Sequence, residues 1–263
     1  MTSILNGVKS ILAQLHGKND GELIDEAYAC ICKNWNKKPT KSRKNWALRF
    51  VPMPDDSIKK EGHGAKSEVP LERAIAYAFK EKGVLWNQMP VASGLVENSD
   101  KDRRRAIDLI YKPDSPTENY EFIELKVANN KINTPKDAAI EIIEYGLLYL
   151  FSREHMGAIG YSADKQPILG ASFIGLRVLA EDAYYKSWMG DDYYNFNNFN
   201  ESLNNYIESN PKRFGELKMD FKFESFHSNF ESPEIVGTKF DEKLIEYLRN
   251  AISTKATYPK KSI

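Results

Sequence analysis

RAIDLIY (residues 105–111) and YEFIELKVA (residues 120–128) are the two stretches that decide the fold. Both are rich in the apolar, β-branched and aromatic residues that are typical of buried β-strands. The eight residues between them, KPDSPTEN, favour turns because they include Pro, Asp, Ser and Asn. We therefore predict a β-hairpin centred near Pro116, in which Asp108 lies directly opposite Glu124.

Side chains of a β-strand point alternately to two faces, so the predicted hairpin has one apolar face and one mixed face. The apolar face carries Ile107, Leu109, Ile123, Leu125 and Val127. The mixed face carries Asp108, Glu124 and Lys126, flanked by Ala106, Ile110 and Phe122. Three ionisable groups among apolar neighbours are costly in free energy, and such an arrangement indicates a functional site.

The opposed acids of the mixed face call for a counter-charge. Directly opposed carboxylates lie about 5 Å apart and repel each other. A divalent cation between Asp108 and Glu124 would remove this repulsion, and Mg²⁺ takes oxygen ligands from one or two carboxylates and water. Lys126 points the same way and is able to bind a water molecule or a phosphate oxygen.

An acid-x-Lys triplet is by itself a common pattern, and its ordinary interpretation is a salt bridge on an exposed sheet. The chain contains four such triplets, which start at Glu124, Glu216, Asp220 and Asp241. Only the triplet at Glu124 follows an apolar strand that carries an Asp in the opposed position. The functional interpretation is therefore restricted to this triplet.

The neighbouring segments give the order of the elements. We expect a helix from Pro70 that ends at Gly83, then strands over 84–91, 105–111 and 120–128. A helix over 134–153 and a strand over 171–179 complete the order α-β-β-β-α-β. Helices over 3–16 and 20–35 precede this core, and a strand over 218–226 and a helix over 239–253 follow it, with a loose tail over 254–263. The fold class is α/β with a mixed sheet (α+β).

Asp108, followed one strand later by Glu124-Leu125-Lys126, resembles the signature of the PD-(D/E)xK nuclease superfamily, which has the restriction-endonuclease-like fold. The resemblance covers residues 68–180, where the element order also matches. The Pro that gives the family its name is absent, and Ile107 stands in its place. On this basis residues 1–54 are an N-terminal helical region with a basic connector, 55–180 the nuclease-like core, and 181–263 a C-terminal extension packed on the core.

The resemblance implies hydrolysis of phosphodiester bonds, most often in DNA, with Mg²⁺ or Mn²⁺ as cofactor. Asp108, Glu124 and the backbone carbonyl of Leu125 would bind the metal ion, and Lys126 would position the attacking water. Glu72, on the preceding helix, would assist, with Glu68 as a rival. Glu141 and Glu144 are expected in the polar stripe of the next helix, although Glu141 could face the cleft.

Two groups of basic residues are candidates for binding nucleic acid. Residues 33–54 contain seven Lys or Arg and no acid, with Trp35 and Trp46 available to stack on bases. The second group leads directly into the strand of Asp108. The candidate phosphate contacts are Lys41, Arg43, Lys44, Arg103, Arg104 and Arg105. The alternative for the first group is an ordinary solvated connector.

The composition excludes several classes of protein. Lys plus Arg equals Asp plus Glu, at 37 each, so the chain does not bind nucleic acid by bulk charge. Cys30 and Cys32 are the only cysteines, which excludes a disulfide framework and a four-cysteine zinc site. No apolar run reaches the ~18 residues of a membrane span. We expect a cytoplasmic protein that does not enter membranes, and the resemblance makes a homodimer a candidate assembly.

Two other interpretations of the hairpin stay open. The chain could be a catalytically inactive module that keeps the nuclease fold and binds nucleic acid or protein. Alternatively, the three charged side chains could form an ion cluster on the surface, in which case Asp108 and Glu124 would lie on opposite faces. The position of these two side chains in the structure distinguishes the last interpretation from the others.

Overall fold

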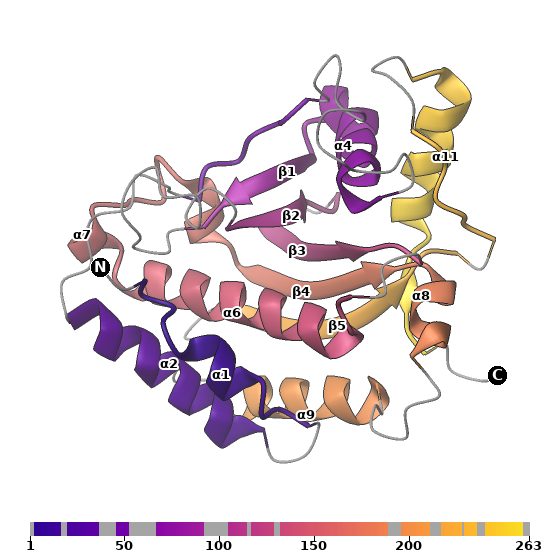
Figure 1. Cartoon of the computed structure of the whole chain (residues 1–263). Coiled ribbons are helices and arrows are strands. Elements are labelled where there is room, and N and C mark those ends of the chain that lie inside the picture. Colours follow the sequence, from indigo (N-terminus) through magenta and orange to yellow (C-terminus); the bar gives the residue numbers. More distant parts are fainter. Residues whose placement is uncertain are drawn as a thin grey trace.

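A six-stranded mixed sheet forms the centre of the computed structural model (Figure 1). The structure describes residues 3–16, 20–36, 46–52, 67–91, 105–114, 117–128, 132–188, 196–210, 217–227, 229–235 and 240–259. The strands lie in sequence order: β1 (Leu85–Pro90), β2 (Ala106–Tyr111), β3 (Asn119–Lys126), β4 (Phe173–Ala180), β5 (Lys218–Ser225) and β6 (Ala256–Thr257). Neighbours are antiparallel from β1 to β3, parallel from β3 to β5, and antiparallel again between β5 and β6.

Helices cover both faces of the sheet (Figure 1). On one face lie α4 (Glu68–Phe79), which continues into the 3-10 turn η1 (Lys80–Lys82), and α11 (Glu242–Ser253). On the other face lie α6 (Pro135–Glu154) and α9 (Phe196–Ser209). The helices α1 (Val8–Leu12) and α2 (Gly21–Asn36) pack on their outer side, away from the sheet. The shorter elements are α7 (Met156–Ile159), η2 (Pro167–Gly170) and α8 (Asp182–Ser187).

Helix α6 is buried on nearly all sides because it lies between the sheet and the outer helices. Thr134 and Asp137 form a capping box at its start, with Pro135 in the first turn. Gly146 allows the helix to approach β4 closely, since a Cβ at this position would lie 2.7 Å from a methyl carbon of Leu176. The predicted helix over 134–153 is thereby confirmed within one residue at each end.

The order of elements predicted for residues 70–180 is present as α4, β1, β2, β3, α6 and β4, with α7 and η2 between α6 and β4. The structure thus confirms an α/β fold with a mixed sheet. Strand β5 lies within one residue of its prediction, and α11 ends where predicted. The first helix is shorter than predicted, since α1 has five residues.

The expectation of a loose tail over 254–263 is wrong for its first residues. Residues 256–257 form β6, which pairs with the end of β5. Lys255 is held by two buried acids, with Nζ 2.5 Å from Glu224 Oε2 and 2.9 Å from Glu121 Oε2. A two-residue strand has no periodic pattern in the sequence, so its pairing arises from tertiary contacts. Residues 260–263 lie outside the described residues.

Trp46 is a core residue and not a surface for stacking on bases. Its side chain is fully buried, stacks on Phe122 at a centroid distance of 6.2 Å and meets Tyr149 edge to face at 5.5 Å. Trp35 packs edge to face against Phe151 and is half-buried. Trp46 therefore anchors this basic segment to the core.

Candidate active site

Asp108 and Glu124 come together where β2 begins and β3 ends. The observed register pairs Leu109 with Ile123, as the predicted hairpin requires, and Asp108 and Glu124 are the next residues along the two strands. The backbone N–H of Leu125 donates to Asp108 Oδ2 at 3.0 Å, which fixes the carboxylate against β3. Glu124 is 4% exposed, whereas Asp108 keeps partial contact with solvent.

One predicted detail of the hairpin is wrong. Ile107 packs in the core on the side of α6, with Ile110 and Phe122, and not with Leu109 and Ile123 on the side of α4. The simple alternation of side chains therefore does not hold through Asp108. Opposite this point, Gln88 of β1 has a φ of 52°, a conformation that non-glycine residues adopt rarely. The sheet is irregular where the acids gather.

Lys126 provides the ammonium group of the site. Its Nζ lies 2.6 Å from Glu124 Oε1 and 3.4 Å from Glu68 Oε2, and it donates to the carbonyl of Leu125 at 3.0 Å. The residue is 2% exposed. These contacts exclude the interpretation of the triplet as a solvated surface ion cluster. They also place Glu68, the rival of Glu72, in direct contact with Lys126.

Glu72 of α4 is buried beside the site and is held by two amides. Asn87 Nδ2 donates to Oε1 at 2.8 Å, and Gln88 Nε2 donates to Oε2 at 2.7 Å. Both amides come from consecutive residues of β1, which is possible because Gln88 has a positive φ. Sequence reasoning missed Asn87 and Gln88, since no motif marks them and their role depends on how α4 packs on β1.

The acids of the site repel each other, and Glu72 and Glu124 are almost completely shielded from water. Burial raises the pKa of Asp108 to about 8, and the Glu72 carboxylate adds to this. Burial also raises the pKa of Glu72 to about 7, against the lowering effect of the two amide hydrogen bonds. The pKa of Glu124 is raised well above its usual range, by burial and by Asp108. The site thus has more negative charge than it can stabilise alone.

The ammonium of Lys126 is stabilised by the same acids. Burial lowers the pKa of Lys126, but the carboxylates of Glu124, Asp108 and Glu68 outweigh this effect and raise the pKa well above its usual range. Lys126 therefore stays protonated at neutral pH. As an ammonium it donates hydrogen bonds and cannot accept a proton.

Helix α6 brings further groups to the site. Glu141 raises the pKa of Glu124 and accepts a hydrogen bond from the Tyr145 hydroxyl at 3.0 Å, so it faces the acidic group. The expectation that Glu144 belongs to a solvated polar stripe is wrong, since it is 7% exposed. The reason is the outer helical layer, which covers a side of α6 that would otherwise meet water.

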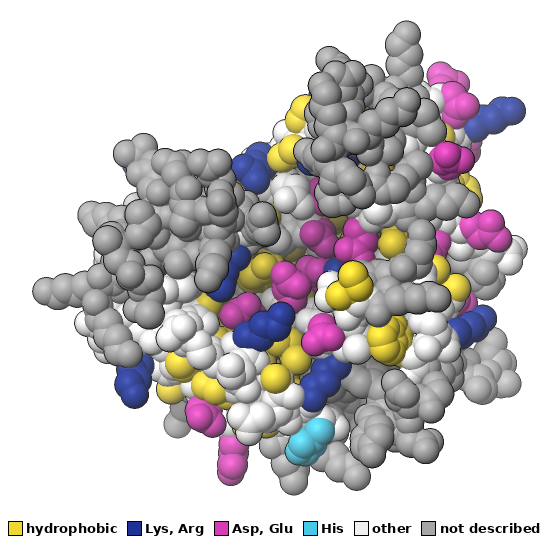
Figure 2. All heavy atoms as spheres, in the orientation of Figure 1, with side chains coloured by type: hydrophobic (Ala, Val, Ile, Leu, Met, Phe, Trp, Pro, Cys, Tyr) yellow, Lys and Arg dark blue, Asp and Glu magenta, His cyan; other side chains and the backbone are white. Residues whose placement is uncertain are grey.

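Figure 2 shows acidic side chains gathered in the middle of the face displayed, over the region of β2 and β3, with Lys and Arg side chains among them. In the described residues, no three His, Cys, Asp or Glu side chains form a group that could hold a metal ion by themselves. Asp108 and Glu124 nevertheless fit Mg²⁺, which needs only one or two carboxylates and keeps water as its remaining ligands. The repulsion between the two carboxylates would be relieved by a cation, and the solvent contact of Asp108 leaves access for the water ligands of the ion.

Of the six residues predicted to contact phosphates, the structure describes only Arg105. Arg105 is half-buried and donates from Nη1 to Ser3 Oγ at 3.3 Å, so it binds the N-terminal segment. Lys41, Arg43, Lys44, Arg103 and Arg104 lie outside the described residues.

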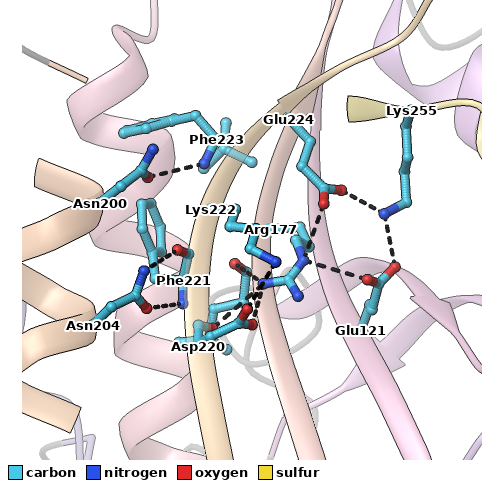
Figure 3. Close-up of polar contacts among 12 residues, drawn as sticks. Glu121, Arg177, Asn200, Asn204, Asp220, Phe221, Lys222, Phe223, Glu224 and Lys255 are labelled. Atoms are coloured by element: carbon cyan, nitrogen blue, oxygen red, sulfur yellow. Dashed lines mark hydrogen bonds and ion pairs between the residues drawn. The ribbon is translucent and has the colours of Figure 1, made fainter. Parts of the chain in front are cut away.

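A second group of charged side chains lies across β3, β4 and β5 (Figure 3). Unlike the candidate site, this group has as many basic as acidic side chains. Arg177 forms ion pairs with Asp220, Glu121 and Glu224, and its guanidinium lies over Gly175, where a Cβ would collide with it. Lys222 and Lys255 complete a set of three acids and three bases. This group neutralises its own charge and needs no added cation.

Comparisons of the chain with protein-family models, with curated proteins and with solved structures found no match. Within the part of the chain that the structure describes, no helix has the length and apolar character to cross a membrane.

Proposed function

We propose that this protein is a metal-dependent nuclease that hydrolyses phosphodiester bonds in DNA, with a core of the restriction-endonuclease-like type. The observation that carries the proposal is the convergence of Asp108, Glu124 and Lys126 at the end of β3, where the acids repel each other. The element order from α4 to β4 supports the same proposal.

Asp108 and Glu124 would hold Mg²⁺ or Mn²⁺ together with the carbonyl of Leu125. When bound, the ion would supply Lewis-acid stabilisation of negative charge on the phosphate. The hydrogen bond from the Leu125 N–H fixes the Asp108 carboxylate, so the ligand is oriented before the ion arrives.

Lys126 acts as a hydrogen-bond donor and not as a general base. Its ammonium is kept protonated by three carboxylates. From this position it would orient the attacking water by donating to its oxygen and would stabilise charge on a phosphate oxygen. Glu72, fixed by two amides, would add negative potential and hold water near Asp108.

One observation favours a second candidate, a binding module without catalysis. Lys126 Nζ already donates to the Leu125 carbonyl and pairs with Glu124, so an ammonium occupies two of the proposed metal ligands. If this arrangement persists when Mg²⁺ or Mn²⁺ is present, the fold would bind nucleic acid or protein without cutting. Calorimetry with Mn²⁺ separates the candidates, because only the nuclease should bind the ion in a manner that depends on Asp108.

Cleavage of plasmid and oligonucleotide DNA with Mg²⁺ or Mn²⁺ tests the proposal. Asp108→Asn and Lys126→Met should each reduce the rate about a hundredfold or more, since each removes a group that acts on the reacting phosphate. Lys222→Met is the matched control, because Asp220 and Lys222 form a triplet with the same spacing and an ion pair of 3.0 Å. Equal activity of all four proteins, or an equal loss in the control, would contradict the proposal.

A further inference from the structure

Arg49 is a cation that the structure anchors beside the acidic group. Its Nε donates to the carbonyl of Gln88 at 2.6 Å, and the residue is exposed. Gln88 is the residue whose side chain holds Glu72. In β1, Asn87 pairs with Leu109 of β2 and Met89 pairs with Ile107. Gln88, between them, therefore lies across from Asp108.

The segment that carries Arg49 is fixed by other contacts. Asn87 exchanges two hydrogen bonds with the backbone of Val51, at 2.8 Å and 3.1 Å, and its own N–H donates to the carbonyl of Arg49 at 3.3 Å. Trp46 anchors the start of the segment in the core. The segment therefore lies along β1 without help from the guanidinium of Arg49.

The outer nitrogens of Arg49 contact no hydrogen-bond or ion-pair partner in the part of the chain that the structure describes. Among the described residues, the guanidinium makes one hydrogen bond, through Nε, and no ion pair. Partial burial lowers the pKa of Arg49, and the Glu72 carboxylate opposes this effect, so the field of the acidic group reaches the guanidinium. An arginine held through Nε presents its two Nη groups as a planar fork, the geometry that binds two oxygens of one phosphate.

We infer that Arg49 binds a backbone phosphate of the DNA substrate next to the phosphate that is cut. This inference rests on the proposed function for the identity of the substrate. An exposed cation beside buried carboxylates offsets the repulsion between these acids and the polyanion, and so allows the DNA to approach. Arg49 is thus a binding residue at the entrance of the site, and the strained Gln88 connects it to Glu72.

Binding, measured apart from cleavage, tests the inference. The probe is a short fluorescein-labelled duplex DNA, followed by anisotropy at several salt concentrations with the Asp108→Asn protein, which is expected to cut about a hundredfold more slowly or less. Adding Arg49→Gln, which removes the charge and keeps an amide donor, should weaken binding about tenfold and reduce the salt slope by about one. Arg49→Lys should restore part of the affinity, because it keeps the charge and loses the fork. Lys222→Met, which removes a partly exposed cation from β5, is the control and should change neither quantity.

The outcomes separate this inference from the proposed function. Unchanged affinity and salt slope in Arg49→Gln would overturn the inference, even if Asp108→Asn abolishes cleavage. A tenfold loss of affinity in Arg49→Gln supports the inference, even if the protein with Asp108 intact does not cut. An equal loss in Lys222→Met would also overturn it, because the effect would then be one of net charge. Thermal unfolding of each variant verifies that the segment stays in place.

Discussion

Lys126 Nζ lies 2.6 Å from Glu124 Oε1, and both side chains are almost completely shielded from solvent. The two residues are separated by one position on β3, so they share one side of the strand. In the absence of a divalent ion, the ammonium is the nearest counter-charge to a carboxylate that is almost completely buried. This pair therefore contributes to the stability of the site as well as to its proposed chemistry.

Lys126→Met should destabilise the metal-free protein by about 3 kcal/mol, because it leaves a buried carboxylate without its counter-charge. Urea unfolding in the presence of EDTA measures the change. Lys222→Met, which removes a lysine that is 39% exposed from the same kind of triplet, should cost at most about 0.5 kcal/mol. Similar losses in the two variants would contradict the assignment of a buried ion pair to Glu124 and Lys126.

The stability of the metal-free protein should fall as the pH rises from about 5 to about 8. The pKa of Asp108 is about 8 and that of Glu72 about 7, both above the values of the unfolded chain. The folded state thus binds more protons than the unfolded state in this range, and the stability it gains at low pH is lost as these acids ionise. Urea unfolding at several pH values with EDTA measures this dependence.

Asp108→Asn is the control for the pH dependence. The amide oxygen keeps an acceptor for the Leu125 N–H, while the charge is removed. The variant should be more stable than the original protein by about 1–2 kcal/mol at pH 8, and its stability should depend less on pH. A slope equal to that of the original protein would show that Asp108 does not titrate in this range.

The opposition of Asp108 and Glu124 could be predicted from the sequence because it depends on local features. A turn-forming stretch fixes the centre of the hairpin and with it the register of the two strands. The period of two places Glu124 and Lys126 on one side of β3, but it fails in β2 between Ile107 and Leu109. The roles of Asn87 and Gln88 could not be predicted, since they depend on the packing of α4 against β1 and on one positive φ. The sequence pattern of α6 likewise predicts a solvated Glu144, because a single helix does not show that α1 and α2 cover this side of it.

Trp46 shows a different limit of sequence reasoning. A tryptophan among lysines and arginines has the composition of a nucleic-acid contact, and only the tertiary structure reveals that it packs against Phe122 and Tyr149. Trp46→Ala should therefore reduce the free energy of unfolding by about 3–5 kcal/mol. Chemical denaturation measures this loss. Trp46→Phe keeps most of the packing and should lose less, and DNA affinity per folded molecule should stay the same. A stable Trp46→Ala protein with weak DNA binding would instead support a stacking role.

Arg177→Met tests the balanced charge group of β3, β4 and β5. Arg177 pairs with Asp220 at 2.5 Å and with Glu121 and Glu224 at 3.3 Å each, so its removal leaves three acids with two lysines. We expect a loss of about 3–5 kcal/mol in urea unfolding, because a buried ion pair costs most when one partner is removed. Lys222→Met again provides the comparison, since it removes a base from the exposed edge of the same group. Because this group lies apart from Asp108 and needs no cation, Mg²⁺ should not restore the stability of Arg177→Met. Restoration by Mg²⁺ would show that the excess of acids in this second group is itself able to bind a divalent ion.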